Sequence, residues 1–217
     1  HDVCMGIPTE FANSTAGNGS QISGYLWSFG DPSSVTDTCS AKHPTYQYGN
    51  SGAYNAELIA TNTIGCADTI IHTLTVHPLP SARFDYSVSC AGYKTHFTDA
   101  SDTVNAPLSN WRWDFMDISG PIGFSHAVNP DFLFTEAGDY KARLIVTDAN
   151  GCLDTLQKQV TAHPVPVSAF DINDNYENVQ GKILLNNGTI DASHYEWDFG
   201  NGFTSSAENP TVAYNKD

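Results

Sequence analysis

Acidic side chains are the residues of this sequence best suited to hold a ligand. Asp+Glu total 24 and Lys+Arg 9 among 217 residues, so the formal net charge is −15. Calcium is bound by clustered carboxylate and carbonyl oxygens, and three aspartates at expected strand ends are the candidate ligands: Asp31, Asp117 and Asp198. Neither an EF-hand loop nor a glycine-rich calcium repeat is present. The alternative is that these aspartates are solvated turn carboxylates.

Hydrolytic chemistry has weaker support. A Ser-His-Asp triad is defined by geometry rather than composition, and the sequence contains neither G-x-S-x-G nor HExxH. The CxxC and HxxxH spacings of zinc sites are also missing. We therefore predict that the chain is not an enzyme. Sugar binding through exposed aromatic rings is a second candidate, at Tyr46, Tyr48, Trp111 and Phe124, with core or interdomain packing as the alternative.

The charge also limits the class of partner. An acidic surface repels phosphate backbones, which argues against nucleic acid and anionic membranes. The sequence has no run of about 18 apolar residues, so we predict no segment that inserts into a membrane. Hydrophobic residues make up 40% of the chain, which is enough to form cores rather than a disordered polymer.

An internal repeat indicates which elements position these residues. YLWSFGD at 25–31 recurs as NWRWDFMD at 110–117 and as YEWDFGN at 195–201. The first two tryptophans are 86 residues apart, and the same offset links many other landmarks of the first two repeats. Alternate residues of a strand share a face, so each Trp-x-Phe pair should point into a core. The predicted core residues are Trp27, Phe29, Tyr54, Trp113, Phe115, Tyr140, Trp197 and Phe199.

Each repeat has the pattern of antiparallel β structure. AELIATN and ARLIVTD are rich in apolar and β-branched residues, and Gly, Asn, Asp and Pro punctuate the chain at short intervals. About seven short strands per repeat are typical of an immunoglobulin-like sandwich. HPLP at 77–80 and HPVP at 163–166 are predicted to be stiff linkers. The predicted domains are therefore 1–79, without its opening strand, 80–165, and 166–217, without its last strands.

The repeated residues resemble the PKD domain. W-x-F-G-D is followed by His/Asn-Pro and an aromatic residue, and then by Gly-x-Tyr-x-x-x-L-x-x-T-[ND]-x-x-Gly. The matching residues are Trp27, Phe29, Gly30, Asp31, Gly52, Tyr54, Leu58 and Gly65, then Trp113, Phe115, Asp117, Gly138, Tyr140, Leu144 and Gly151, and finally Trp197, Phe199, Gly200, Asn209 and Pro210. Met116 and Asn201 depart from the pattern, at the positions of its Gly and its Asp. Gly30 and Gly200 can take a positive φ in the turn that follows the strand, so Met116 is predicted to require a different local backbone.

The resemblance carries expectations about fold and function. The variant with V-x-C-x-G and G-C-x-D-T is similar to PKD repeats in large surface proteins of Bacteroidota, such as gliding-motility adhesins exported by the type 9 secretion system. It implies tandem immunoglobulin-like, PKD-type antiparallel β-sandwiches at the bacterial cell surface. It implies a non-enzymatic stalk, adhesin or filament unit whose partners are other repeats or subunits, surface glycans or other cells. The alternative is an accessory carbohydrate-binding PKD module of a secreted hydrolase.

Five cysteines predict disulfide chemistry. Cys4 and Cys66 are as far apart in sequence as Cys90 and Cys152, so one pairing closes the same loop in both repeats. Such a loop would stabilise a domain by about 3–4 kcal/mol in the chain-entropy model. The rival pairing joins neighbouring domains, because the first and last turns of this topology lie at opposite ends. Cys39 has no repeat partner and is predicted to be a free thiol or an intermolecular cross-link.

Overall fold

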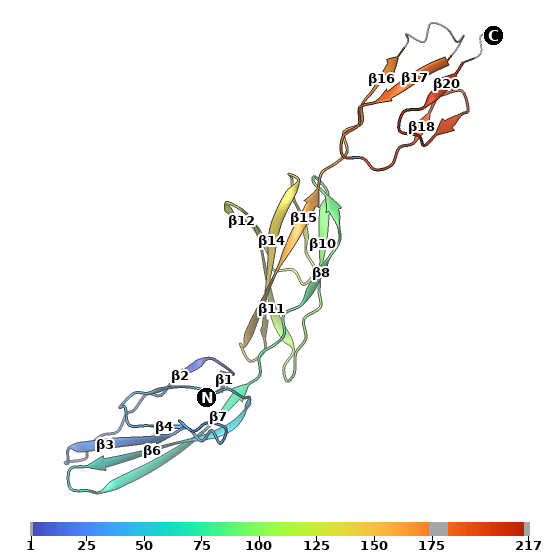
Figure 1. Cartoon of the computed structure of the whole chain (residues 1–217). Helices are drawn as coiled ribbons and strands as arrows, with labels where there is room; N and C mark the ends of the chain where they lie inside the picture. The colour runs from blue at the N-terminus through green and yellow to red at the C-terminus, as the bar shows by residue number, and fades with distance from the viewer. Residues whose placement is uncertain (1, 174–181, 215–217) are drawn as a thin grey trace. The chain divides into compact units, whose positions relative to one another are not determined.

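The computed structural model describes residues 2–173 and 182–214, and every regular element among them is a β-strand (Figure 1). This confirms the predicted all-β class. None of the described segments is a helix that is long and apolar enough to cross a membrane. Two compact units are distinguished, and the second repeat contributes to both. The first unit holds His1–Tyr86, His96–Pro130 and Tyr140–Gln159, and the second holds Ser87–Thr95, Asp131–Asp139 and Val160–Asp217.

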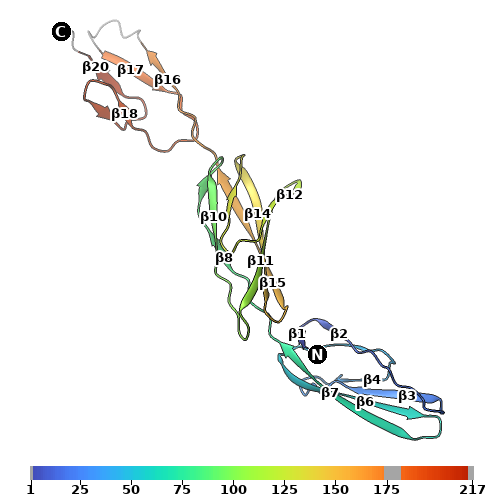
Figure 2. The ribbon, with the colours of Figure 1, turned by 180° about the vertical axis from the view of Figure 1, so that it is seen from behind.

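The first repeat folds into a five-stranded sheet and a two-stranded sheet (Figure 2). The larger sheet has the order β1 (Asp2–Cys4), β7 (Ala67–His77), β6 (Gly52–Asn62), β3 (Ile22–Ser28) and β4 (Thr38–Cys39). The smaller sheet pairs β2 (Pro8–Glu10) with β5 (Thr45–Gln47). β1 runs parallel to β7 with Cys4 opposite His77, and the other pairs are antiparallel.

The second repeat forms a five-stranded and a three-stranded sheet. The first has the order β12 (Gly120–Ser125), β11 (Leu108–Asp117), β14 (Gly138–Asp148), β15 (Leu153–His163) and β9 (Ser89–Cys90). The second has the order β13 (Asp131–Leu133), β10 (Lys94–Asp99) and β8 (Phe84–Tyr86). β9 runs parallel to β15 with Cys90 opposite His163, which repeats the pairing of Cys4 with His77 at an offset of 86 residues.

The third repeat has two small sheets. One has the order β16 (Phe170–Asn173), β17 (Lys182–Asn187) and β20 (Thr211–Ala213), and the other pairs β18 (Trp197–Asp198) with β19 (Thr204–Ser205). Trp197 and Phe199 were predicted as core residues, but they are only half-buried. The physical reason is that the five described strands of this repeat give these rings less cover than the larger sheets give the first two repeats.

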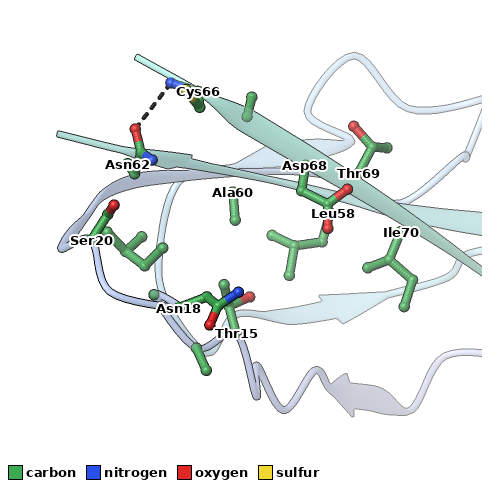
Figure 3. Close-up of a pocket in the computed structure, with 14 residues that line it drawn as sticks. Thr15, Asn18, Ser20, Leu58, Ala60, Asn62, Cys66, Asp68, Thr69 and Ile70 are labelled. Carbon is green, nitrogen blue, oxygen red and sulfur yellow. Dashed lines mark hydrogen bonds between the residues drawn. The ribbon is translucent and has the colours of Figure 1, made fainter. Parts of the chain in front are cut away.

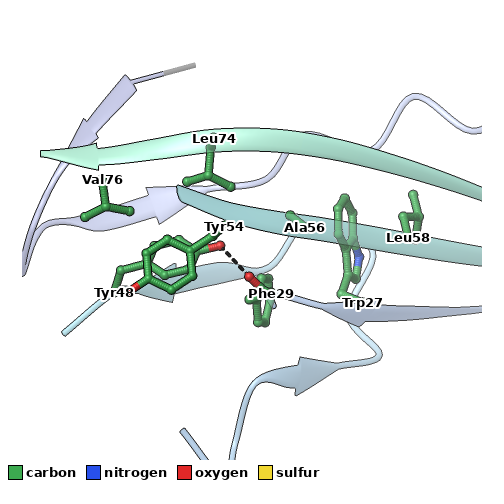
Figure 4. Close-up of a cluster of buried hydrophobic side chains, with 8 residues drawn as sticks. All are labelled: Trp27, Phe29, Tyr48, Tyr54, Ala56, Leu58, Leu74 and Val76. Carbon is green, nitrogen blue, oxygen red and sulfur yellow. Dashed lines mark hydrogen bonds between the residues drawn. The ribbon is translucent and has the colours of Figure 1, made fainter. Parts of the chain in front are cut away.

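The core of the first repeat lies between its two sheets (Figure 4). Its buried members are Trp27, Phe29, Tyr48, Tyr54, Ala56, Leu58, Leu74 and Val76. The Phe29 ring stacks on Tyr46 at a centroid distance of 4.2 Å, and Tyr48 packs on Tyr54 at 4.4 Å. The buried Tyr48 hydroxyl donates to the carbonyl of Phe29 at 3.0 Å, so its polar atom is satisfied.

The core of the second repeat is more completely enclosed. Trp113 and Phe115 are fully buried, and the Trp113 ring lies 5.0 Å from Phe84 and 5.5 Å from Phe97. Tyr140, which was also predicted as core, is half-buried near the first residue of β14. It stands at the margin of the core, where the strand has only just begun, and not at its centre.

The Trp-x-Phe strands end differently in the first two repeats. Gly30 has a φ of +69°, and a Cβ there would lie 2.4 Å from the carbonyl oxygen of Asn55. Glycine is therefore required both for conformation and for space. At the equivalent position in the second repeat, Met116 continues the strand with a register shift after Phe115. This confirms the prediction that Met116 requires a different backbone.

The predicted domain boundaries at Leu79 and Val165 stay predictions.

Candidate functional site

The Trp-x-Phe strand of every repeat is hydrogen-bonded to the loop that carries His/Asn-Pro. Each indole N–H donates to the carbonyl of an alanine: Trp27 to Ala41 at 3.0 Å, Trp113 to Ala127 at 3.0 Å, and Trp197 to Ala207 at 2.8 Å. The next proline carbonyl accepts a backbone N–H: Phe11 to Pro44 at 2.9 Å, Phe97 to Pro130 at 2.9 Å, and Leu185 to Pro210 at 3.0 Å. The alanines were not predicted from the sequence, although Ala-x-[His/Asn]-Pro recurs three times. These residues hold a loop in place and are not reactive groups.

Asp31 is buried in the turn that follows Phe29. Its Oδ1 accepts the backbone N–H of Ser33 at 3.0 Å and the Ser33 hydroxyl at 2.6 Å. Its Oδ2 accepts the Tyr46 hydroxyl at 3.0 Å. The Ser33 hydroxyl bond, helped by the other two, holds the pKa of Asp31 below its usual value although partial desolvation raises it. The carboxylate therefore fixes its own turn.

The other two calcium candidates also bond to local backbone. Asp117 accepts the N–H groups of Ser119 at 2.7 Å and Gly120 at 3.0 Å, and Asp198 accepts that of Gly200 at 2.9 Å. Within residues 2–173 and 182–214, no group of three or more His, Cys, Asp or Glu side chains is arranged to hold an ion. The structure does not bring these aspartates together in one cluster, and calcium binding stays a prediction.

A buried acid of the second repeat is neutralised by two arginines. Asp114 Oδ2 accepts Arg143 Nη2 at 2.6 Å and Nε at 3.1 Å, while Oδ1 accepts Arg112 Nε at 3.1 Å. Burial raises the pKa of Asp114, but the bonds from the two guanidinium groups outweigh it and leave the pKa lowered. The charge is paired, so this acid is structural and not a general acid or base.

The disulfide of the structure joins the first repeat to the second. Cys4 and Cys152 are bonded across 148 residues, with their Cα atoms 5.5 Å apart. The pairing of Cys4 with Cys66 and Cys90 with Cys152 is therefore wrong, and the rival link between neighbouring repeats is confirmed. The reason is the length of β7: Cys4 lies opposite its last residue, and Cys66 precedes its first. Eleven residues of strand separate them by about 33 Å.

The three other cysteines carry free thiols. Cys39 is half-buried, and its sulfur accepts the N–H of Ala41 at 3.4 Å. It has the free thiol that was one of its two predicted states, and an intermolecular cross-link stays a prediction. Cys66 is exposed and Cys90 is half-buried. Cys90 lies opposite the end of β15 and Cys152 precedes its start, so the same strand-length argument separates this second pair.

Most of the aromatic side chains proposed for sugar stacking are used in packing. Tyr48 is buried, and Tyr46 stacks on Phe29. The indole N–H of Trp111 donates to Asp99 Oδ2 at 2.7 Å, so the half-buried ring is held at the edge of the core. Phe124 is 72% exposed on the edge strand β12, which leaves it as the one candidate of the four that is open to a ligand.

A groove lies in the first repeat (Figure 3). It has a volume of about 280 Å³ and lies beside β6 and β7. Leu58 and Ala60 form an apolar floor, while Thr15, Asp68 and Ile70 lie along its sides. We call it the β6–β7 groove. Apolar side chains next to hydroxyl, carboxylate and backbone groups can hold a peptide, but they do not compose a nucleophile with its base.

The fold and these contacts define the class of protein: consecutive all-β, immunoglobulin-like sandwiches whose repeated polar groups hold turns and loops in place. A profile of the PKD domain matches residues 1–77 and 75–165. The chain therefore belongs to the PKD domain family. Residues 166–217 reproduce the tryptophan and proline hydrogen bonds of the first two repeats, and their assignment as a third PKD repeat stays a prediction.

Three known proteins are similar to parts of this chain. It is 42% identical over 67 residues to a microbial collagenase of Vibrio alginolyticus, a segment that covers 31% of this chain and 8% of the collagenase. The PKD1 domain of the Vibrio cholerae metalloprotease PrtV is 28% identical, covering 39% of this chain and 98% of that one, with a TM-score of 0.35. The PKD1 domain of Vibrio anguillarum Epp is 24% identical, covering 40% and 96%, with a TM-score of 0.36.

Proposed function

We propose that this chain is a non-catalytic, extracellular accessory module that serves a secreted hydrolase. The observation that carries the proposal is the pair of consecutive PKD matches over residues 1–165, together with the 42% identity to a short segment of a collagenase. A segment that is 8% of such an enzyme has the size of an appended module and not of its catalytic domain. In this role the module holds the hydrolase near a polymeric substrate.

The chemistry of the described residues supports a role without catalysis. Asp31, Asp114 and Asp117 accept hydrogen bonds from turn backbone, hydroxyl or guanidinium groups, which hold these carboxylates in structural roles. The disulfide between Cys4 and Cys152 supports an oxidising, extracellular location, because such bonds persist outside the cytosol. The exposed ring of Phe124 offers a surface for stacking on a polymer such as a polysaccharide.

Co-sedimentation tests this function. The chain would be mixed with insoluble cellulose, chitin or collagen fibres, and the bound fraction would be measured after centrifugation. We expect saturable retention on one of these polymers, and weaker retention for Phe124→Ala if that polymer is a polysaccharide. Tyr93→Ala is the control, since this ring is also exposed but lies elsewhere. Recovery of all the chain in the supernatant with every polymer would overturn the accessory role.

A second candidate function is favoured by the disulfide alone. A covalent link between consecutive repeats restricts their relative motion, which suits a stalk, an adhesin or a surface-filament unit of the kind exported by the type 9 secretion system. Single-molecule stretching of the chain, with and without Cys4→Ser, tests this role. We expect an earlier extension step in the variant, and equal extension curves would remove the disulfide as support for a stalk.

A further inference from the structure

The solvent face of the larger sheet of the second repeat carries basic residues in an otherwise acidic chain. Lys+Arg total 9 against 24 Asp+Glu in the whole sequence. Three of the nine, Arg112, Lys141 and Arg143, lie on the adjacent strands β11 and β14. Trp113 and Leu144, which pair across these strands, are buried in the core. Because alternate residues of a strand share a face, the three basic side chains lie on the opposite, solvent face.

A carboxylate on the same face fixes the two arginines. Asp114 Oδ1 accepts Arg112 Nε at 3.1 Å, and Oδ2 accepts Nε and Nη2 of Arg143 at 3.1 and 2.6 Å. The Asp114 side chain is 8% exposed, whereas those of Arg112 and Arg143 are 58% and 39% exposed. A guanidinium group has several N–H donors in a rigid fork, so both arginines keep donors for a ligand. Asp114 therefore holds two accessible guanidinium groups next to each other.

An exposed aromatic ring adjoins this carboxylate on the next strand. Phe124 of β12 is paired with Asp114 of β11 and is 72% exposed. Directly opposite side chains of neighbouring strands have Cβ atoms about 5 Å apart, so the ring lies beside the carboxylate that binds both arginines. His126 packs edge-on against the ring at a centroid distance of 5.9 Å, and its Nδ1 donates to the carbonyl of Trp111 at 3.1 Å. These contacts hold the ring in place.

The other two repeats have different residues at the equivalent positions. Those of the first repeat, 86 residues earlier, are uncharged or acidic: Leu26, Ser28, Thr38, Asn55 and Glu57. In the third repeat Glu196 and Asp198 flank the tryptophan of the Trp-x-Phe strand. Two repeats therefore form the same kind of strand without basic residues on this face. The basic cluster of the second repeat is thus not a requirement of the sheet.

We infer that this face of β11, β12 and β14 binds a polysaccharide that carries carboxylate groups, a polyuronate. We call it the cationic face, and its residues are Arg112, Phe124, Lys141 and Arg143. The arginines bind a uronate carboxylate through charge-assisted hydrogen bonds, as both already do with Asp114. The Phe124 ring packs on the apolar face of a neighbouring sugar unit.

The position of the arginines within the sheet favours a sugar polymer over an acidic peptide. An extended peptide binds a sheet at its edge through main-chain hydrogen bonds, whereas β11 and β14 are inner strands of the order β12-β11-β14-β15-β9. Phe124 and Arg143 are two strands apart, which separates their Cα atoms by about 10 Å. The ligand must therefore cross the strands and present both an apolar ring face and a carboxylate. Each unit of a polyuronate carries both groups.

The acidic charge of the remaining chain limits the affinity of the cationic face but does not prevent binding. At physiological ionic strength the Debye length is about 8 Å, so acidic side chains farther away act only weakly on the ligand. Arg112, Lys141 and Arg143 outnumber Asp114, which leaves the face itself positive. The site does not depend on the accessory role proposed above, because a stalk or an adhesin can present the same face.

A labelled oligogalacturonate tests the inference on the whole 217-residue chain. Fluorescence anisotropy in about 0.15 M salt should show saturable binding with one site per chain. The methyl-esterified form of the same oligomer keeps the sugar rings but loses the charges, and it should bind at least about tenfold more weakly. Equal binding of the two forms would overturn the inference, because the face would then not recognise the carboxylate.

Two further ligands separate the sugar from its charge. An oligoglutamate of similar length carries carboxylates without ring faces for Phe124 and should bind at least about tenfold more weakly than the oligogalacturonate. Equal or tighter binding of the oligoglutamate would overturn the inference in favour of an acidic peptide. Tighter binding of a sulfated oligosaccharide would likewise overturn the assignment of a carboxylate ligand.

Two variants of the chain remove contacts to the ligand without breaking the core. In Arg112→Gln the buried Asp114 keeps both hydrogen bonds from Arg143, and Phe124→Ala removes a ring that is already exposed. We expect each variant to weaken oligogalacturonate binding by about fivefold or more, with melting temperatures close to that of the wild type. Unchanged binding in both variants would place the ligand elsewhere and contradict the site.

Neighbouring exposed residues outside the cationic face provide matched controls. Lys94 begins β10 and Tyr93 precedes it, and both are exposed. Lys94→Gln removes a positive charge, as Arg112→Gln does, and Tyr93→Ala removes an aromatic ring, as Phe124→Ala does. Both controls should bind the oligogalacturonate as the wild type does. A loss in the controls as large as that in the two test variants would contradict a site confined to the cationic face.

Discussion

The first and second repeats have nearly the same arrangement of strands but differ in how well their cores are covered. The parallel contacts of β1 with β7 and of β9 with β15 match residue for residue at an offset of 86. In the second repeat Phe84 covers Trp113, which has no exposed surface, whereas Trp27 is 6% exposed and a groove opens beside Leu58. The comparison indicates that Ala82 and Phe84, at and just before the start of β8, cover the core of the second repeat in addition to its sheets.

Among the changes that test this comparison, removal of the Phe84 ring is expected to lower the free energy of unfolding most. Phe84→Ala should destabilise the second repeat by about 3–5 kcal/mol, because a fully buried ring is deleted beside Trp113. Urea unfolding followed by tryptophan fluorescence measures the change, and Tyr93→Ala at a site 64% exposed is the control. A loss below about 1 kcal/mol would mean that Phe84 does not close the core of the second repeat.

A glycine after the Trp-x-Phe strand should be needed for stability in the first repeat but not in the second. Gly30→Ala should destabilise the first repeat by about 1–3 kcal/mol, because φ is +69° and the new Cβ meets the carbonyl of Asn55. The reciprocal change Met116→Gly should lower the stability of the second repeat by less, since the backbone at Met116 does not require a glycine. Differential scanning calorimetry of both variants compares them. Equal losses of stability in the two variants would contradict the proposal that the two strands end differently.

The smallest expected effect is the acid dependence contributed by Asp31. Because its pKa is lowered in the folded chain, its contribution to stability is complete above the ordinary aspartate pKa and is lost as pH falls through the lowered value. The stability difference between the wild type and Asp31→Asn should therefore shrink as the pH falls below about 4. Denaturant titrations across this range measure it, and a constant difference would show that Asp31 has no lowered pKa.

Much of the fold was readable from the sequence because the signals were local and repeated. The Trp-x-Phe alternation located the strand whose side chains fill the core, and Gly30 was assigned a positive φ from its place in the turn. Met116, in place of a glycine, correctly indicated a changed backbone. Such features depend on neighbouring residues, so strand periodicity and turn chemistry are sufficient to predict them.

The disulfide and the groove could not be predicted in the same way. Equal spacing of Cys4–Cys66 and Cys90–Cys152 suggested a loop within each repeat, but equal spacing follows from the repeat itself and carries no information on distance. The pairing depends on which end of a strand each cysteine occupies. The groove likewise depends on whether a segment distant in sequence from Asp68 or Asp154 covers it.

Amide hydrogen exchange on the intact chain tests the central claim most directly. Each amide of β6 and β7 can be compared with the amide 86 residues later in β14 and β15, so local sequence and strand pairing are matched. We expect slower exchange in the second repeat, with the largest differences at the residues flanking Leu58 and Leu144. Equal protection in the two repeats, or stronger protection in the first, would contradict the claim that Ala82 and Phe84 help to close the core of the second repeat.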